Sequence, residues 1–537
     1  MKAQIVAGIR RGAVLAAVLV MALLMVSVSK AQSSKGILAG TVRDSSGAVV
    51  PAAKITVINE ETAETRDTAS DGEGTYRIEA ISPGSYAVHA TAAGFESFSA
   101  KGVQVNPSVV TTYEPVLTVG SAATTVEVQA STNAINTENG ALSGTINTAE
   151  LRDLPIFSLN PIELATTVPG VQIVNQSQFS NGVNIEVNGT RPRANNFLID
   201  GADINDTTIN GQAVQPNIPD MYASETILTN SYTAEYGRGG GGIVNLITQG
   251  GTNKFHGTVW DLYSGSGLNA LDGVSRQTAG SSKARYDQHQ YGFTAGGPII
   301  HDKLFAFGAL QLSRFYGKEQ STRVALPDAA GYATLKSINT PNSLTLQQLF
   351  LNGSYLSTFA GPSAPCDATG TDPNNLCVAV QAVNPADCPG GTPCSISFDY
   401  YTRPNPSELS PDTQWTYRID FQPRQADVFY MRYLHDRSSL TPDFFNNGTQ
   451  LPGLDTNQGG PSELGSGAWT HIFSPTLVNE FRASETRISF IFGLTPQAQA
   501  NPLSQIPTTT ISGISNLPPL GAVSGDPQGR NLDLYQF

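Results

Sequence analysis

Apolar and polar residues alternate along many short segments of this chain, and the segment from Trp415 to Phe421 shows the pattern clearly. Its odd-numbered positions are apolar and its even-numbered positions are polar: Trp415, Tyr417, Ile419 and Phe421 against Thr416, Arg418 and Asp420. Because successive side chains of a strand point to opposite faces, this segment predicts a strand with one apolar and one polar face.

The same alternation predicts roughly eight strands after Lys254. They cover residues 254–263, 285–299, 303–317, 413–423, 426–437, 467–473, 477–488 and 531–537. Short links alternate with long ones, and the longest link runs from about Lys318 to Pro411. Strands of about ten residues with short turns on one side and long loops on the other are typical of transmembrane β-barrels. An edge strand of a soluble sandwich explains the regular link lengths less well. We therefore expect residues 254–537 to be the first part of an antiparallel transmembrane barrel, with the longest link on its outer side.

Two further regions precede these strands. Residues 36–119 hold strand-length runs separated by turns such as Asp71-Gly72 and Pro83-Gly84, which predicts a small β-sandwich. Residues 151–253 begin with a short helical piece interrupted by prolines and include the strand-like run Ile243–Thr248. The resemblance described below implies that they form an α+β domain. The fold class is therefore β-dominated: a sandwich, an α+β domain and a partial barrel.

Residues 120–150 are small and polar and predict a linker. Within it, Thr124, Thr125, Val126, Glu127, Val128 and Gln129 form an alternating run. Such a run can add as a strand to the edge of another protein's sheet. The alternative is that it forms the last strand of the sandwich.

Gly237, Gly239 and Gly242 match the glycine fingerprint of a dinucleotide-binding turn. That turn must open a helix, so that the pyrophosphate sits on the helix N-terminus. Here the β-branched run Ile243–Thr248 follows and predicts a strand. The sequence therefore predicts no nucleotide cofactor.

The first 31 residues predict a secretory signal peptide. Lys2, Arg10 and Arg11 precede an apolar run, Ala13–Val28, and small residues allow cleavage after Ala31. The alternative, a single membrane anchor, needs a run of about 20 residues, which is longer than this one.

Composition and motifs limit the function further. The net charge is −13 over 537 residues, so no basic surface is expected to bind nucleic acid. The six histidines are scattered, and the sequence contains no G-x-S-x-G, H-E-x-x-H or Walker A motif. We therefore expect no catalytic residue, no metal site and no enzyme activity.

All four cysteines, Cys366, Cys377, Cys388 and Cys394, lie in the longest link. An even number of cysteines in an exported, loop-like region indicates disulfides, and a zinc site is the alternative. Pairing of sequence neighbours, Cys366 with Cys377 and Cys388 with Cys394, is one of three connectivities. We take it as our hypothesis.

Two resemblances follow from motifs. The segments Gly40–Val57, Asp71–Tyr76 and Ile81–Tyr86 resemble the carboxypeptidase regulatory-like domain, which carries no peptidase centre. The elements Arg193–Gly201 and Ala234–Asn253 resemble the plug domain of TonB-dependent outer-membrane transporters. A regulatory-like domain ahead of a plug is similar to the Oar-like branch of that family. Plugged barrels have about 22 strands, so the chain is expected to be an N-terminal fragment.

The resemblance identifies the motif residues of the plug as Arg191, Arg193, Asn195, Asn196, Asp200, Gly201, Glu235, Gly237, Gly241 and Gly242. Gln249-Gly250 departs from the pattern, since a basic residue is common there. We expect Arg191, Arg193 and Asp200 to lie buried or half-buried at the contact between plug and barrel. The alternative is that they belong to a solvated loop. We expect the glycines to let the plug backbone pass close to the barrel wall.

The resemblance also implies a function. It implies a transporter in the outer membrane of a Gram-negative cell that moves a substrate too large for porins into the periplasm. The run Thr124–Gln129 would be the TonB box, the segment that pairs with a periplasmic TonB-type energy-coupling protein. Outer-membrane lipid and an unidentified ligand would be the other partners. The alternative is an adhesion or surface-structural protein that uses the plugged barrel as an anchor.

Overall fold

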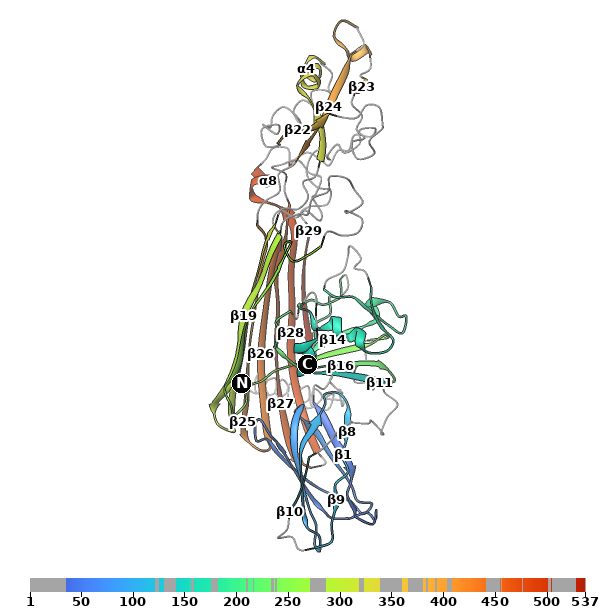
Figure 1. Cartoon of the computed structure of the whole chain (residues 1–537), viewed down its shortest axis with the longest axis vertical. Coiled ribbons are helices and arrows are strands. Elements are labelled where there is room, and N and C mark those ends of the chain that lie inside the picture. Colours follow the sequence, from blue (N-terminus) through green and yellow to red (C-terminus); the bar gives the residue numbers. More distant parts are fainter. Residues whose placement is uncertain are drawn as a thin grey trace, which may run out of the picture.

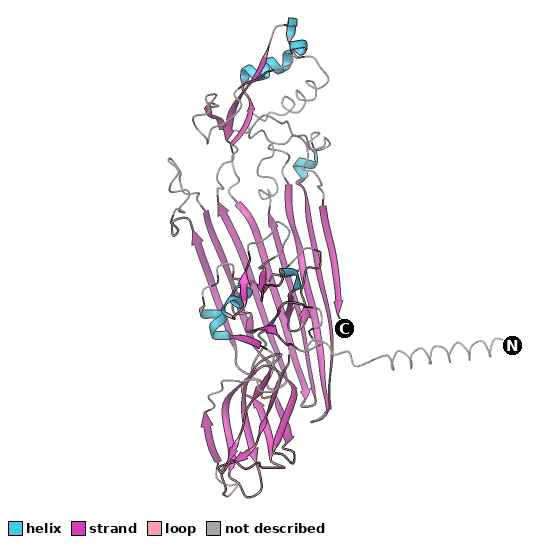
Figure 2. Ribbon diagram, turned by 90° about the vertical axis from the view of Figure 1, so that its right-hand side faces the viewer, coloured by secondary structure: helices cyan, strands magenta, loops and turns pink. Residues whose placement is uncertain are grey.

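The computed structural model describes residues 35–120, 125–129, 142–154, 156, 159–174, 182–208, 211–215, 217–232, 236, 239–270, 286–317, 323–338, 360–365, 380–382, 385–391, 394–402, 408–440, 454, 456–475, 477–500, 504 and 528–536. They form an N-terminal sandwich, a plug domain and a wide antiparallel sheet, which we call the wall sheet (Figures 1 and 2). The sandwich lies at one end of the wall sheet, and the plug lies against one of its faces. The expected signal peptide falls outside the described residues.

The N-terminal sandwich has the predicted architecture. Its strands are β1 (Gly36–Thr41), β2 (Arg43–Asp44), β3 (Lys54–Asn59), β4 (Thr65–Ala69), β5 (Thr75–Ile81), β6 (Gly84–Thr91), β7 (Ser97–Val105), β8 (Val110–Thr112) and β9 (Val116–Leu117). One sheet has the order β5-β1-β8 and the other ends β7-β6-β3-β4. Alternate apolar residues of both sheets, such as Leu38, Val57 and Val88, fill the space between them, as in other sandwiches.

The region expected to be a linker contributes strands to both neighbouring domains. Strand β10 (Thr125–Gln129) pairs in parallel with β7 and becomes the edge of the sandwich's five-stranded sheet. Strand β11 (Leu142–Asn147) pairs with the plug sheet, so the plug begins before the expected Leu151. The alternating pattern predicted an extended conformation, but only tertiary pairing decides which sheet such a strand joins.

The plug is built on a five-stranded mixed sheet of order β11-β16-β17-β14-β15. Its strands are β14 (Asn196–Ile199), β15 (Ala202–Asp203), β16 (Tyr222–Asn230) and β17 (Ile243–Thr248), with a separate pair β12 (Val171–Ile173) and β13 (Ile185–Val187). Helix α2 (Thr148–Asp153) and the 3-10 turns η1 (Pro161–Thr167) and η2 (Pro192–Ala194) complete it. Asn147 caps α2 by accepting from the amides of Ala149 and Glu150, and proline begins both 3-10 turns.

The wall sheet contains eight strands in the predicted order. They are β18 (His256–Gly265), β19 (Tyr286–Ile300), β20 (Leu304–Gly317), β25 (Glu408–Arg424), β26 (Asp427–Leu440), β27 (Thr456–Ser474), β28 (Leu477–Leu494) and β29 (Gln528–Gln536). Most extend several residues beyond the predicted bounds at the end distant from the sandwich. The longest extension, Thr456–Ser466 at the start of β27, is polar and contains Gly459, Gly460 and Gly465, so hydrophobic alternation does not mark it. The extension of β28, Ser489–Leu494, is mostly apolar.

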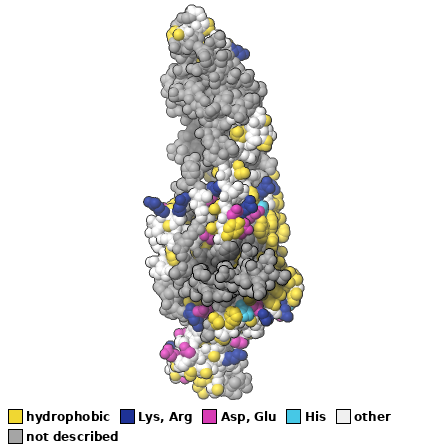
Figure 3. All heavy atoms as spheres, turned by 180° about the vertical axis from the view of Figure 1, so that it is seen from behind, with side chains coloured by type: hydrophobic (Ala, Val, Ile, Leu, Met, Phe, Trp, Pro, Cys, Tyr) yellow, Lys and Arg dark blue, Asp and Glu magenta, His cyan; other side chains and the backbone are white. Residues whose placement is uncertain are grey.

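The two faces of the wall sheet differ as the alternation predicted. Side chains such as Arg432 and Leu434 are buried on the inner face, which the plug contacts, and Phe421 and Trp469 are exposed on the other. Viewed from behind, hydrophobic side chains gather at the level of the sheet, with charged side chains above and below them (Figure 3). None of the described helices is both long enough and apolar enough to cross a membrane.

The longest link forms its own small structure at the end of the wall sheet opposite the sandwich (Figure 1). It contains β21 (Arg323–Pro327), α4 (Ala329–Ser337), β22 (Ala360–Pro365), β23 (Val380–Ala382), η4 (Pro385–Asp387), η5 (Pro389–Gly391) and β24 (Ser395–Thr402). A last short helix, α8 (Pro496–Ala500), follows β28. Cys388 and Cys394 form a disulfide with their Cα atoms 5.7 Å apart. Cys366 and Cys377 fall outside the described residues.

Candidate functional site

The candidate site is centred on Asp200, in the tight turn between β14 and β15. Asp200 and Gly201 both have positive φ, +48° and +75°, a conformation that glycine and aspartate tolerate better than most residues. All four residues of β14 are buried, which fixes the position of this turn in the plug. The turn holds the Asp200 carboxylate, 2% exposed, against the inner face of the wall sheet.

The Asp200 carboxylate joins plug and wall through several charged hydrogen bonds. Arg432 Nη1, from β26, lies 2.6 Å from Oδ2, and Arg418 Nη1, from β25, lies 3.4 Å from the same oxygen. Within the plug, Thr248 donates its amide to Oδ1 at 2.8 Å and its hydroxyl to Oδ2 at 2.7 Å. Asp420 pairs with the other side of the Arg418 guanidinium at 2.8 Å. We call these five residues the Asp200 ion-pair cluster.

The charges of the Asp200 ion-pair cluster balance, since two arginines face two aspartates. Burial by itself would raise the pKa of Asp200, but Arg432, Arg418 and the two bonds from Thr248 outweigh burial and lower it. Asp200 is therefore ionised when the plug is docked. The phenol of Tyr430 donates to the Asp200 carbonyl at 3.3 Å, and the Arg418 guanidinium lies over the Tyr430 ring, 5.0 Å from its centroid.

Other polar contacts along the same face also connect plug and wall. Arg530 on β29 pairs with Asp206 at 2.9 Å, and Thr486 on β28 donates to the Asp203 carbonyl at 2.6 Å. Apolar contact accompanies them, because Phe307 and Leu434 of the wall pack into the core of the plug. The plug is thus held by a mixed apolar and ionic interface.

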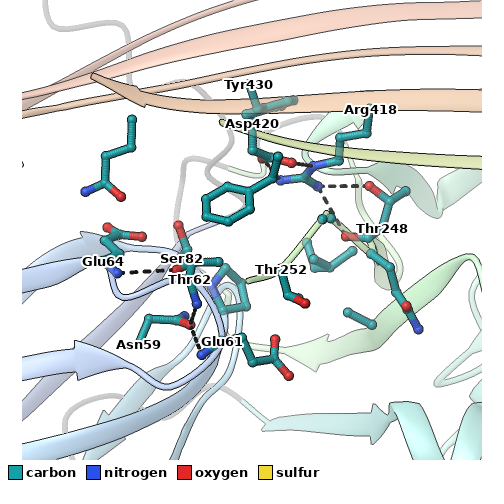
Figure 4. Close-up of a pocket in the computed structure, with 18 of the residues that line it drawn as sticks. Asn59, Glu61, Thr62, Glu64, Ser82, Thr248, Thr252, Arg418, Asp420 and Tyr430 are labelled. Atoms are coloured by element: carbon teal, nitrogen blue, oxygen red, sulfur yellow. Dashed lines mark hydrogen bonds and ion pairs between the residues drawn. The ribbon is translucent and has the colours of Figure 1, made fainter. Parts of the chain in front are cut away.

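A cavity of about 540 Å³ lies beside the Asp200 ion-pair cluster, where sandwich, plug and wall sheet meet. Figure 4 shows Asn59, Glu61, Thr62 and Glu64 of the sandwich facing Thr248 and Thr252 of the plug, with Arg418, Asp420 and Tyr430 of the wall beyond.

Two hydrogen bonds to main-chain carbonyls hold the sandwich at this junction. The Asn253 amide donates to the Glu61 carbonyl at 2.9 Å. Arg66, which pairs with Glu64 at 2.8 Å, donates to the Gln425 carbonyl in the turn between β25 and β26 at 3.0 Å. The sandwich is therefore attached both to the start of the first wall strand and to the rim of the wall.

The expectation for the two plug arginines is wrong. Arg191 and Arg193 are exposed around η2, and Arg193 donates to the Thr208 carbonyl at 3.1 Å, within the plug. Pro192 begins this turn, and none of its residues is buried. Of the three residues expected at the contact, only Asp200 lies there.

The asparagine pair, Asn195 and Asn196, forms hydrogen bonds in the interior of the plug. The Asn195 amide group accepts from the Gly242 amide at 2.8 Å and donates to the Ile185 carbonyl at 2.6 Å. Asn196 accepts from the Asn205 side chain at 2.7 Å. Both side chains therefore satisfy buried polar groups between plug strands.

The glycines have a different role from the one expected. A Cβ on Gly242 would lie 2.6 Å from Val187, and one on Gly241 would lie 2.4 Å from Asn195. These contacts are internal to the plug, so the expected approach to the wall is wrong for both. Gly251 makes that approach instead, since its Cβ would lie 2.6 Å from the Ala306 carbonyl. Glu235 and Gly237 fall outside the described residues.

Sequence reasoning missed Thr248, Arg418, Asp420 and Arg432 as partners of Asp200. The signal was present in part, because Arg418 and Asp420 occupy the polar face of the alternating segment Trp415–Phe421. What the sequence lacks is the pairing of residues more than 200 positions apart. Among the described residues, no three His, Cys, Asp or Glu side chains group closely enough to hold a metal ion.

Comparison with known proteins agrees with this architecture. Residues 37–118 match the carboxypeptidase regulatory-like domain, residues 128–244 the TonB-dependent receptor plug domain, and residues 247–536 the outer membrane beta barrel domain. The chain is 27% identical over 322 residues to the TonB-dependent transporter Oar of Myxococcus xanthus, covering 56% of this chain and 28% of the relative. It is 28% identical over 148 residues to the ferrienterobactin receptor of Escherichia coli, and the match covers 25% of this chain and 20% of the relative.

The siderophore receptor PirA of Acinetobacter baumannii is a structural neighbour with TM-score 0.38 and 14% identity, covering 73% of this chain and 44% of its own. The chain spans less than a third of the length of the two curated relatives.

A plug docked against the inner, polar face of an antiparallel wall defines a plugged outer-membrane barrel protein. The chain belongs to the family of TonB-dependent outer-membrane receptors, in the Oar-like form with an N-terminal regulatory-like domain. Its location is therefore the Gram-negative outer membrane, and its relatives are receptors and transporters rather than enzymes.

Proposed function

We propose that the chain belongs to a transporter that moves a substrate too large for porins into the periplasm, driven by a TonB-type coupling protein. The observation that carries the proposal is the Asp200 ion-pair cluster. Asp200 and Arg432 are each 2% exposed or less, and one belongs to the plug and the other to the wall.

An ionic contact suits a plug that must both dock and move. Each charge of a buried pair regains hydration when the pair separates, so such a pair contributes little net stability. An apolar contact of equal area would expose surface at about 25 cal/mol per Å² when it opened. A plug in a permanent surface anchor gains nothing from a contact that can separate and reform, so this observation favours transport over the adhesion alternative.

The coupling segment in this proposal is Thr124–Gln129, the candidate TonB box. The backbone of β10 pairs with β7 on one side only, and no second neighbour pairs with it among the described strands. Its other edge can therefore accept a strand from a coupling protein, with main-chain hydrogen bonds providing the affinity. Because β10 is held by the sandwich, force applied to it would also act on the sandwich and on the junction with plug and wall.

The test compares Val126→Pro with Val126→Ala in the full-length protein. Proline deletes one backbone donor and should abolish coupling, whereas alanine keeps the ladder and should have a mild effect. Binding of a purified periplasmic TonB-type domain is measured first. Energised uptake is then followed with a panel of ferric chelates, cobalamin, oligosaccharides and peptides. Normal binding and uptake by the proline variant would place the box elsewhere or favour the anchor.

A further inference from the structure

A second polar cluster lies on the inner face of the wall sheet, beyond the Asp200 ion-pair cluster. Asp412 and Gln414 come from β25, Asp436 from β26 and Gln311 from β20, which are neighbouring strands. In the strand register Gln414 faces Asp436 on one side and Gln311 on the other. Gln414 is 1% exposed, Gln311 2% and Asp436 5%.

The hydrogen bonds of this cluster leave several oxygens without a donor. Gln414 Nε2 lies 3.4 Å from Asp412 Oδ2 and 3.3 Å from Asp436 Oδ1. The plug reaches the cluster through Gln215, whose amide donates to Asp436 Oδ2 at 3.3 Å. Within the described part of the chain, Asp412 Oδ1, Gln414 Oε1 and Gln311 Oε1 are buried and have no hydrogen-bond partner.

Two adjacent carboxylates, Asp436 buried and Asp412 half-buried, require a positive charge or a proton. Arg314 is the near cation, but its Nη1 donates to the main-chain carbonyls of Ser313 at 2.9 Å and Asp412 at 3.5 Å. In the hydrogen bonds described above, the two carboxylates receive only amide donors. Like charges this close repel, and burial increases the cost of leaving them uncompensated.

We propose that this cluster binds a calcium ion. Its free acceptors are carboxylate and amide oxygens, which hard divalent cations prefer. The last torsion of a glutamine side chain is broad and roughly two-fold, so the Gln414 amide can turn. The turn would direct Oε1 toward both carboxylates and the NH₂ group away from them, toward the strand that carries Gln311 and its unpartnered oxygen.

The spacing of these atoms fits calcium better than magnesium. When the amide is turned, Gln414 Oε1 takes the position of Nε2. That position lies 3.3 Å from Asp436 Oδ1 and 3.4 Å from Asp412 Oδ2. Ligands at right angles and about 2.4 Å from an ion are about 3.4 Å apart, as calcium requires. For magnesium at about 2.1 Å the separation is about 3.0 Å. Asp412, which is only half-buried, would leave the ion room for water ligands.

A calcium ion here would connect three parts of the molecule. It would bind β25 and β26 through their carboxylates and would fix Asp436, which in turn holds the Gln215 amide of the plug. Calcium would therefore strengthen the contact between plug and wall on the side away from the sandwich. This inference does not depend on transport.

The experiment is calcium titration calorimetry on the purified, detergent-solubilised chain after removal of divalent ions with EDTA. We expect one saturable calcium site that binds magnesium more weakly. Asp436→Asn and Gln414→Leu should each weaken calcium binding at least about tenfold. The control is Asp261→Asn, the same chemical change at an exposed position outside the cluster. Asp412→Asn, at a less buried position, replaces Asp436→Asn if that variant does not fold.

A second measurement separates calcium from a shared proton. Calcium should slow hydrogen exchange of the Gln215 amide in the parent chain and in Asp261→Asn, but not in Gln414→Leu. If the carboxylates of Asp412 and Asp436 only share a proton, the Gln414 oxygen is not needed as a ligand. Absence of a saturable calcium site, or calcium binding that Asp436→Asn and Gln414→Leu leave unchanged, would overturn the proposal.

Discussion

Arg432 Nη1 lies 2.6 Å from Oδ2 of Asp200, although the two residues are 232 positions apart in the chain. Asp200 belongs to the plug and Arg432 to the wall, so this contact exists only when the plug is docked. The amide of Thr248 donates to the same carboxylate at 2.8 Å and therefore reports on the contact from the plug side.

The first prediction concerns Arg432→Met. The substitution keeps much of the side-chain volume but leaves Asp200, within the described part of the chain, with Arg418 as its remaining arginine partner. Removing one partner of a buried ion pair typically costs about 3–5 kcal/mol. We expect the plug to be destabilised by up to this amount and the Thr248 amide to exchange faster. The matched control is Arg437→Met, an exposed arginine on the same strand. Equal exchange at Thr248 in both variants would contradict the prediction.

The second prediction concerns the pH dependence of the same contact. Because the pKa of Asp200 is lowered in the folded protein, ionised Asp200 stabilises the docked plug above the pKa of the unfolded chain, about 3.9. That contribution is lost as the pH falls through the lowered value. Plug stability should therefore decrease in acid below about pH 4, and Asp200→Asn should remove this part of the decrease. Denaturant titrations at pH 3 and pH 7 measure the difference.

The third prediction concerns Glu225, on β16 in the plug. Its side chain is fully buried, and within the described residues neither carboxylate oxygen has a hydrogen-bond partner. Burial raises the pKa of Glu225 well above its ordinary value, so the group is protonated in the folded plug. Stability is then lost as the pH rises above about 4.3, at about 1.4 kcal/mol per pH unit until the folded group ionises. Glu225→Gln should flatten the profile between pH 5 and pH 7, and an unchanged slope would refute this account.

The fourth prediction concerns Gly251, where the plug chain passes over the wall. A Cβ there would lie 2.6 Å from the Ala306 carbonyl and 2.7 Å from the Gly297 carbonyl, and main chain cannot move aside easily. Overpacking of this kind costs about 1–3 kcal/mol, so Gly251→Ala should destabilise the docked plug by that order. Gly72→Ala is the control, because a Cβ at Gly72 meets no atom within 4 Å. Urea unfolding of the two variants provides the comparison.

The sequence predicted the β-dominated fold and the order of the wall strands because hydrophobic alternation is a local signal. It placed Asp200 at the contact between plug and wall through the plug motif. The expected burial of Arg193 failed because exposure depends on the tertiary position of the turn at Pro192. The expected contact of Gly242 with the wall failed because its close neighbour, Val187, is distant in sequence. Arg432 could not be paired with Asp200 from the sequence, since the pairing depends on strand register across the wall sheet.

The last prediction concerns the attachment of the sandwich to the rim of the wall. Arg66 is 6% exposed on its side chain, pairs with Glu64 and donates to the Gln425 carbonyl. Replacing Arg66 alone would leave Glu64 buried without its partner, so its effects on folding and docking could not be separated. The double variant Glu64→Leu with Arg66→Met removes both charges, a change that is often neutral for the fold.

The double variant should keep the sandwich folded but weaken its contact with the rim. The Asn253 amide, which donates to the Glu61 carbonyl across the junction, should then exchange faster with solvent. The control is Arg77→Met with Glu79→Leu, an exposed ion pair in the same sandwich, which should leave Asn253 unchanged. Hydrogen exchange at Asn253 and thermal unfolding of the sandwich are measured together. Unchanged exchange at Asn253 in a folded double variant would show that the sandwich is held at the rim by other contacts.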